Sequence, residues 1–228
     1  MKNLEIYCVT NKPIKFLENF NYQLCAVGKN NFSKKYLKCD TGKNIYNKEK
    51  HYSELAFHYW YWKNKLDINN ENWIGFCQRR RFLINKDSVD KKITLNNFHE
   101  HFIQSVPSEW NSYEAILCNP IKVNETKISK LLKRGVKSVI KKPSLLINKN
   151  KRSIKLHFDM YHGHGNLSKA IEVMNKTDRY DFEQFVNNST EFNPHIIFIS
   201  KSKIVNKWFT DLYDWLFKCE KIFGFKDL

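Results

Sequence analysis

Short apolar runs, each closed by polar or turn-forming residues, recur along this chain and constrain its fold more than any other feature. The first run, residues 4–10 (LEIYCVT), ends at Asn11-Lys12-Pro13, and proline stops a strand because it has no backbone N–H to donate. Runs of this length and composition predict buried strands. Further runs of this kind cover residues 22–27, 73–77, 113–118 and 195–200.

The stretches between these runs have helical periodicity. Residues 51–65 form the strongest helix, and we expect it to be buried because apolar side chains cover nearly its whole circumference. A long amphipathic helix is predicted over residues 203–223, with Ile204, Trp208, Leu212, Trp215, Cys219 and Ile222 on one side. Shorter helices are predicted over residues 95–104, 122–142, 167–174 and 181–186, and a loop over residues 157–165.

Strands that alternate with helices imply a three-layer α/β fold with a mainly parallel sheet. A length of 228 residues suits one domain, and no linker or repeat interrupts the pattern, so we predict a single domain over residues 1–228. The six cysteines include no C-x-x-C pair, which gives a structural zinc site little support. The sequence shows no apolar leader and no run near the ~18 apolar residues of a membrane span, so we expect a cytoplasmic protein.

A net charge of +16 favours an anionic partner, but charge alone does not choose among nucleic acid, an anionic membrane surface and a phosphorylated substrate. Nucleic acid is the least favoured of the three, because the aromatic residues cluster in the helix expected to be buried and no recognition motif is present. A peripheral contact of the helix over residues 203–223 with anionic lipid at the inner face of the membrane stays open, although ordinary core packing of this helix is the favoured reading.

Ligands of parallel sheets bind beyond the carboxyl ends of the strands, and three polar features fall there. They are Asn11-Lys12, the segment from Gln78 to Arg81, and Asn119-Pro120. The arginines are the sharpest of the three, because a guanidinium fork binds phosphate oxygens bidentately. Arg80 and Arg81 are therefore candidates to hold a diphosphate; the alternative is a basic surface turn or ion pairs with neighbouring carboxylates.

A second polar group comprises His157, Asp159, His162 and His164. Such side chains ligate divalent metals or act as acid and base, but their spacing matches no standard zinc pattern, and a polar loop that only forms hydrogen bonds is the alternative. No G-x-S-x-G, G-x-G-x-x-G or HExxH motif is present, which argues against hydrolases, dehydrogenases and metalloproteases. The Asp-x-Asp that commonly binds metal and diphosphate in nucleotide-sugar enzymes is also absent after every predicted strand.

Several segments together resemble a broadly distributed bacterial family of unassigned domain, found in capsular and exopolysaccharide loci and labelled as sugar transferases. The longest matching segment is DTGKNIYNKEKHYSELAFHYWYWKN, and the segments keep the family's order over nearly the whole chain. Where the family shows His-Tyr-Arg-Arg-Tyr, this chain has Gln78-Arg79-Arg80-Arg81-Phe82, so a role that needs a proton from the histidine is not carried over. The other matching segments are IYCVTNKP, CAVGK, WIGFCQRRRF, MYHGHGNLSKAIEVM and FNPHIIFISKSKIVNKWFTDLYDWLFKCE.

The resemblance implies a GT-A-like nucleotide-sugar-binding domain and a glycosyltransferase, hexosyltransferase-like, that acts on a growing bacterial surface polysaccharide. The implied partners are a nucleotide-sugar donor and a glycan or lipid-linked acceptor. The resemblance and the strand-end positions together suggest donor-site residues and, in the second polar group, catalytic residues. The donor-site candidates are Asn11, Lys12, Asp40, Asn44, Glu54, Gln78, Arg80 and Arg81, and the catalytic candidates are Asp159, His162 and His164.

The diphosphate leaving group gains negative charge during glycosyl transfer, and either a metal or aimed arginines can stabilise that charge. We expect Arg80 and Arg81 to supply it, with no metal site assigned and a supporting divalent ion, Mn or Mg, left open. Two other readings stay open: a catalytically inactive scaffold of a polysaccharide assembly complex, and a basic nucleic-acid-binding protein. For Glu54, a structural carboxylate at the start of a helix is an equal alternative.

Overall fold

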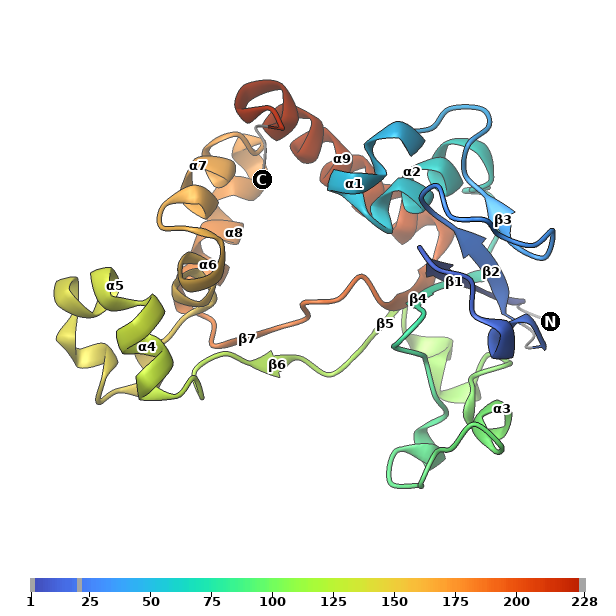
Figure 1. Ribbon diagram of the computed structural model, residues 1–228, viewed down its shortest axis with the longest axis horizontal. Helices are drawn as coiled ribbons and strands as arrows, with labels where there is room; N and C mark the ends of the chain where they lie inside the picture. The colour runs from blue at the N-terminus through green and yellow to red at the C-terminus, as the bar shows by residue number, and fades with distance from the viewer. Residues whose placement is uncertain (1–2, 20–21, 226–228) are drawn as a thin grey trace. The chain divides into compact units, whose positions relative to one another are not determined.

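The computed structural model describes residues 3–19 and 22–225, and the chain forms two compact units (Figure 1). The first unit comprises Met1–Cys118 and Ile196–Tyr213, and the second comprises Asn119–His195 and Asp214–Leu228. The prediction of one functional domain over residues 1–228 stays a prediction. None of the described helices has both the length and the apolar character needed to cross a bilayer.

A six-stranded sheet with the order β3-β2-β1-β4-β8-β5 forms the centre of the first unit. Strands β1 to β4 pair with one another in parallel, whereas β8 is antiparallel to both β4 and β5. This architecture confirms the α/β fold with a mainly parallel sheet. The strands are β1 (Leu4–Thr10), β2 (Gln23–Ala26), β3 (Leu37–Lys38), β4 (Trp73–Gln78), β5 (Ala115–Leu117) and β8 (Phe198–Lys201).

One face of the sheet is covered by α2 (Leu55–Asn64) and by the first half of α9 (Ser202–Phe223). Phe76 of β4 packs between them, with ring centroids 5.4 Å from Tyr61 and 5.8 Å from Phe209. The helix predicted over residues 51–65 is confirmed as buried, but it is broken: α1 (Glu49–Tyr52) ends at Ser53, whose φ of 51° is incompatible with helix.

The opposite face of the sheet carries Ile6, Cys8, Trp73 and Cys77. These side chains pack into a hydrophobic cluster whose other members come largely from irregular segments. The helix predicted over residues 95–104 is reduced there to α3 (Phe98–His101), because Phe102 turns extended and pairs with Ile84. Tertiary pairing therefore overrides the helical periodicity. Short 3₁₀ turns complete this layer: η1 (Lys15–Asn19), η3 (Lys86–Ser88) and η4 (Ser108–Ser112), while η2 (Tyr46–Lys48) precedes α1.

The second unit is helical, with a two-stranded ribbon of β6 (Ile121–Lys122) and β7 (Glu191–Phe192). The prediction of one continuous helix over residues 122–142 is wrong, because Gly135 separates α4 from α5. The backbone approaches closely at this position, since a Cβ at Gly135 would lie only 3.0 Å from the Leu131 carbonyl oxygen. The other elements are α4 (Ile128–Arg134), α5 (Val136–Lys141), η5 (Pro143–Leu145), η6 (Lys149–Lys151), α6 (Ile154–His162), α7 (Asn166–Glu172) and α8 (Lys176–Asn188).

The loop predicted over residues 157–165 is also wrong for its first part, since α6 runs to His162. Ser153 caps α6 by accepting a hydrogen bond of 3.4 Å from the Leu156 N–H, and Gly163, at φ 93°, ends it. Residues 163–165 alone form the loop between α6 and α7.

The buried stripe of α9 differs from the predicted one. Val205, Phe209 and Tyr213 are fully buried, and the Tyr213 hydroxyl donates a 2.6 Å hydrogen bond to the Leu55 carbonyl. Of the side predicted to be apolar, Trp208 is 36% exposed and Ile222 61%. The favoured reading of core packing holds for the first half of this helix.

The core of the first unit contains a neutral histidine. His58 of α2 is 1% exposed, its ring centroid lies 4.4 Å from that of Phe76, and burial lowers its pKa from 6.5 to about 3. The unfolded chain therefore binds a proton at His58 near pH 6.5, whereas the folded chain does not. The free energy of unfolding consequently falls as the pH drops below the pKa of the unfolded state.

We predict that His58→Leu removes part of the acid sensitivity of folding. Between about pH 7 and pH 5 the wild type should lose about 2 kcal/mol more unfolding free energy than the variant, by linkage to this one group. Urea unfolding at both pH values measures the difference, and His99→Gln, which changes an exposed histidine, is the control. An equal acid loss in wild type and His58→Leu would contradict the prediction.

Candidate functional site

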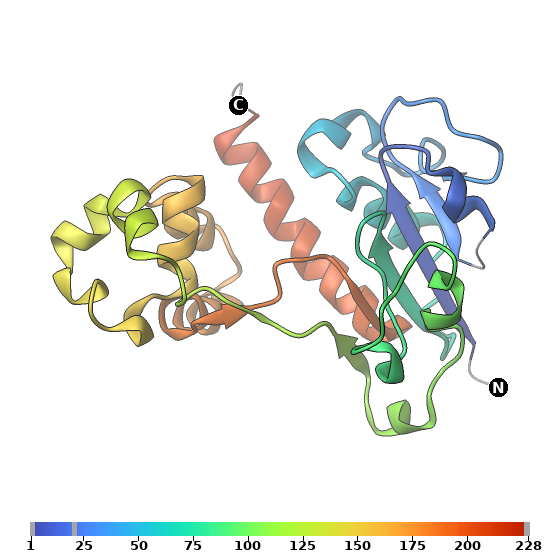
Figure 2. The same ribbon diagram turned by 60° about the horizontal axis from the view of Figure 1, so that its bottom comes forward.

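The carboxyl edge of the parallel strands brings four loops of the first unit together. Register pairs Val9 of β1 with Gln78 of β4, and Thr10 with Ala26 of β2. Ala26 in turn pairs with Lys38 of β3, so the residues that follow all four strands line one edge, about 14 Å long at the usual strand spacing (Figures 1 and 2).

The strand order places a topological switch point between β1 and β4. From β1 the chain proceeds to β2 and β3 on one side, and it returns to β4 on the other. At such a point the connecting loops diverge and leave a crevice outside the carboxyl ends, where ligands of open α/β sheets bind. The sequence-predicted Asn11-Lys12 and Gln78–Arg81 flank this switch point.

The turn after β1 is fixed by Thr10, which is 1% exposed. Its Oγ1 donates a 2.6 Å hydrogen bond to the Lys12 carbonyl and accepts one of 3.1 Å from the Lys12 N–H. Asn11 is held through its carbonyl, which accepts a 2.6 Å bond from Asn30 Nδ2. The Lys12 side chain is left exposed at the edge.

The turn after β4 is closed by two backbone hydrogen bonds between Gln78 and Arg81, of 3.1 and 3.0 Å. This tight turn leaves Arg80 and Arg81 exposed, and no described carboxylate lies within ion-pair distance of any of the three arginines. The alternative that these arginines serve internal ion pairs therefore loses its support, and their donors are available to an anion.

A pair of carboxylates lies at the β2–β3 end of the same edge. Gly28, at φ 79°, follows β2, and a Cβ there would lie 3.2 Å from the Glu49 carboxylate. Burial, together with the charges of Asp40 and Glu49, raises the pKa of Cys39 to about 12. Sequence reasoning selected Asp40 but missed Glu49; the only signal for Glu49 was its place in the longest family-like segment.

The loop over residues 40–44 is held firmly against the end of α2. Asn64 accepts a 3.0 Å bond from the Lys43 N–H through Oδ1, and the Trp60 indole donates a 2.8 Å bond to the Thr41 carbonyl. Asn44 accepts from the Tyr46 N–H at 3.1 Å and donates to the Gly42 carbonyl at 3.0 Å. These contacts make Asn44 a residue that shapes the loop carrying Asp40.

Glu54 precedes α2 and accepts a 2.7 Å hydrogen bond from the Ser53 hydroxyl. This contact fits a carboxylate at the start of a helix. Its role in donor binding stays a prediction.

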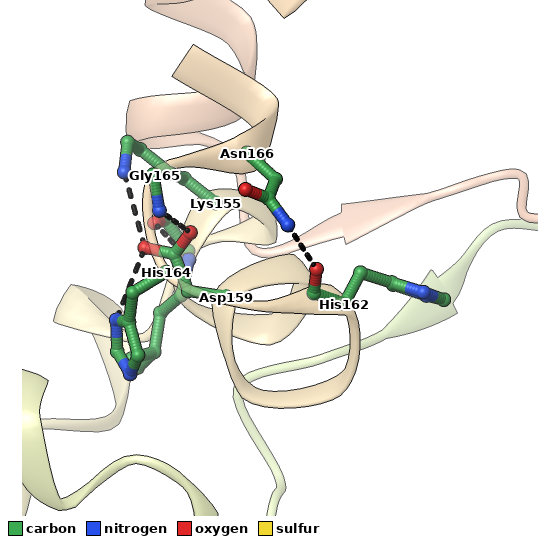
Figure 3. Close-up of polar contacts among 8 residues, drawn as sticks. Lys155, Asp159, His162, His164, Gly165 and Asn166 are labelled. Carbon is green, nitrogen blue, oxygen red and sulfur yellow. Dashed lines mark hydrogen bonds and ion pairs between the residues drawn. The ribbon is translucent and has the colours of Figure 1, made fainter. Parts of the chain in front are cut away.

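The catalytic candidates lie in the second unit, at the end of α6 (Figure 3). The Asp159 side chain is 9% exposed; its Oδ2 lies 3.1 Å from Lys155 Nζ and 3.7 Å from His164 Nδ1. Its Oδ1 accepts a 3.1 Å bond from the Gly165 N–H, which fixes the loop between α6 and α7. Asp159 and His164 are thus brought together.

His162 points away from this pair (Figure 3), and its ring centroid lies 4.6 Å from that of Phe158, with the rings tilted at 40°. His157 is separate as well, since its ring lies 4.8 Å from that of Tyr161, and burial followed by the nearby His162 lowers its pKa. Among the described residues no three His, Cys, Asp or Glu side chains form a group that could hold a metal ion. Chemically, an imidazole oriented by a carboxylate can accept a proton from a hydroxyl group.

Comparison with known proteins agrees with the fold. Residues 5–228 match the model of a family described as Domain of unknown function (DUF4422). A solved structure titled as the apo form of the WbbM bifunctional glycosyltransferase is similar with a TM-score of 0.65 and 20% sequence identity, over 96% of this chain and 37% of that one. The chain therefore has a glycosyltransferase-like fold and spans little more than a third of that protein. No curated protein matches the sequence.

We predict that Gly42→Ala disorders the loop that carries Asp40. Gly42 has a φ of 59°, and an added Cβ would lie 2.2 Å from Asn64 Oδ1, so both strain and a clash oppose the native loop. The unfolding free energy should fall by about 2–4 kcal/mol, measured by urea titration. Gly224→Ala is the matched control, because it has a φ of 67° with no atom within 4 Å of the added carbon. Equal effects of the two variants would contradict the clash.

Proposed function

We propose that this chain, which belongs to the family described as Domain of unknown function (DUF4422), is a glycosyltransferase that uses a nucleotide-sugar donor. The observation that carries the proposal is the row of exposed cations at the β1–β4 switch point of a glycosyltransferase-like sheet, with no described carboxylate within ion-pair distance of the arginines. The fold alone does not assign an activity, and this site supplies the chemical argument.

The donor diphosphate is proposed to bind between Lys12 and the turn of Gln78–Arg81. Each guanidinium can bind two phosphate oxygens, and the turn after β4 is rigid because of its two backbone hydrogen bonds. Gln78, in place of the family's histidine, can donate a hydrogen bond from its amide but cannot transfer a proton.

The nucleoside is proposed to lie towards the β2–β3 end of the edge. Gly28, whose φ of 79° suits glycine, packs its backbone against the Glu49 carboxylate and so places that carboxylate at this end of the edge. Asp40 and Glu49 offer carboxylate oxygens that accept hydrogen bonds from ribose hydroxyls or from a base. A carboxylate end and a cationic end suit the two halves of a nucleoside diphosphate.

When the glycosidic bond to the diphosphate breaks, the negative charge on the leaving oxygen increases. Arg80 and Arg81 are proposed to stabilise that charge without reorganisation, since they are already at the site. A supporting divalent ion, Mn or Mg, stays open, and no metal ligand is assigned to it among the described residues.

For the acceptor hydroxyl, we propose that His164, which lies 3.7 Å from Asp159, removes the proton. Asp159 itself is largely engaged with Lys155 and with the Gly165 N–H, which suits an orienting role. The catalytic role of His162 stays a prediction, and no described carboxylate lies within ion-pair distance of its ring. The acceptor is proposed to be a growing bacterial surface glycan, lipid-linked, with hexosyl transfer at the cytoplasmic side.

We predict that one class of nucleoside diphosphate, with its nucleotide-sugars, raises the melting temperature of the protein. A ligand that binds only the folded state stabilises it by about 2.7 kcal/mol at a hundredfold excess over its dissociation constant. A thermal-shift panel of nucleotide-sugars, nucleoside diphosphates and short DNA, with and without manganese, measures this effect. No shift with any nucleotide would favour an inactive scaffold, and a shift with DNA alone would favour nucleic-acid binding.

We predict that Arg80→Ala and Arg81→Ala each weaken nucleoside diphosphate binding roughly 10- to 100-fold, the usual cost of a lost charge-assisted bond. Turnover should fall by about 10²–10³, because leaving-group stabilisation is lost as well. Lys65→Ala, which removes an exposed charge from the same unit, is the control and should change neither value. Activity that is abolished by a chelator and restored by manganese would contradict charge stabilisation by the arginines alone.

A further inference from the structure

One segment of the second unit carries an extreme charge pattern. Residues 127–151, here called the lysine lobe, contain nine Lys and Arg side chains and no Asp or Glu. A solvated surface helix normally mixes both signs, because like charges at neighbouring positions repel. The composition of the lobe therefore points to an anionic partner.

The lobe is folded, not a mobile tail. Leu131, Val139 and Leu145 form its buried core together with Leu156 and Met160 of α6. In Figures 1 and 2, α4 and α5 lie side by side next to α6 within this unit. Leu131, Val139 and Leu145 are thus buried, whereas the lysines of the lobe are exposed.

Arg152 fixes the lobe to the rest of its unit. It is 3% exposed and donates to four backbone carbonyls, those of Leu145, Leu146, Asn124 and Thr126, at 2.8–3.1 Å. A buried guanidinium satisfied only by carbonyls brings a net positive charge to the base of the lobe.

Lysines of the lobe converge on a pocket of about 630 Å³. Lys155, at its base, is neutralised by Asp159, whereas no described carboxylate lies within ion-pair distance of Lys137, Lys141 or Lys142. Lys151 lines the same pocket. Ammonium groups gathered in this way repel one another until an anion binds among them.

Large apolar side chains stand beside these lysines. Ile140 lines the pocket and is 74% exposed, and Ile147 is 90% exposed. Val136, one turn before Ile140 on α5, is 45% exposed, and Ile128 and Leu132 form the equivalent pair on α4, at 52% and 51%. Isoleucines presented to water among lysines are typical of surfaces that enter the headgroup region of a bilayer.

We propose that the lysine lobe docks on an anionic lipid bilayer, with lipid phosphates among Lys137, Lys141 and Lys142 and with Ile140 and Ile147 in the headgroup region. The lobe contains no aromatic residue, so it lacks the stacking groups with which proteins hold single-stranded nucleic acid. The earlier candidate, α9, is less suited, because Val205, Phe209 and Tyr213 pack inside the first unit. The proposal does not rest on glycosyl transfer, although Asp159 and His164 line the same pocket as these lysines.

The test is co-sedimentation of the purified protein with vesicles of phosphatidylcholine that contain about a third phosphatidylglycerol, at several salt concentrations. Each lysine near such an anionic surface strengthens binding about five- to tenfold. Lys137→Gln/Lys141→Gln/Lys142→Gln is expected to bind roughly 100-fold more weakly. Ile140→Ser/Ile147→Ser, which keeps every charge, is expected to bind at least fivefold more weakly. Both variants change only exposed side chains, and their melting curves should match the wild type.

The matched control is Lys65→Gln/Lys91→Gln/Lys92→Gln, which removes the same charge from exposed positions of the first unit and should retain vesicle binding. Equal loss in the control and in the lobe variants would overturn the proposal in favour of general charge attraction. Normal vesicle binding by the isoleucine variant, with short DNA bound in a manner that depends on the three lobe lysines, would overturn it in favour of a nucleic-acid partner.

Discussion

The parallel pairing of β1 with β4, in register from Leu4–Trp73 to Val9–Gln78, is the interaction on which the proposed donor site depends. It inserts the first strand of the chain between the second and the fourth, and so creates the switch point at the centre of the sheet. Because the register fixes where both strands end, it also sets Asn11-Lys12 beside Gln78–Arg81. Two segments almost seventy residues apart in the sequence then form one cationic site.

In the second unit, hydrogen bonds of buried charged side chains, not strand pairing, hold the segments in place. It has no central sheet, and a buried arginine joins segments that hydrophobic contacts alone would hold loosely. The four carbonyls that bind Arg152 belong to both sides of α4 and α5, so this one side chain closes the lobe. Asp159 does the same for the loop after α6, through Lys155 and the Gly165 N–H. Lysines of the lobe and the pair of Asp159 and His164 line one pocket of this unit.

Sequence alone predicted the parallel core and the location of the arginines, because apolar runs and strand-end positions are local signals. The run over residues 4–10 coincides with β1, and the arginines do follow β4. It did not predict that α6 runs through His157 and Asp159, since a mixed pattern conceals a helix whose only clear signal is the Ser153 cap. Glu49 was missed because its approach to Gly28 is a tertiary contact. The convergence of Lys137, Lys141, Lys142 and Lys151 on one pocket is likewise a tertiary feature that periodicity does not reveal.

The central claim is that a nucleoside diphosphate binds at the carboxyl edge of β1, β2 and β4. Hydrogen–deuterium exchange with and without saturating nucleoside diphosphate tests it most directly, since bound phosphates protect the backbone amides that they contact. The account predicts slower exchange at residues 10–12, 28–30 and 78–81. Protection confined to residues 127–165, with none at these three turns, would contradict it.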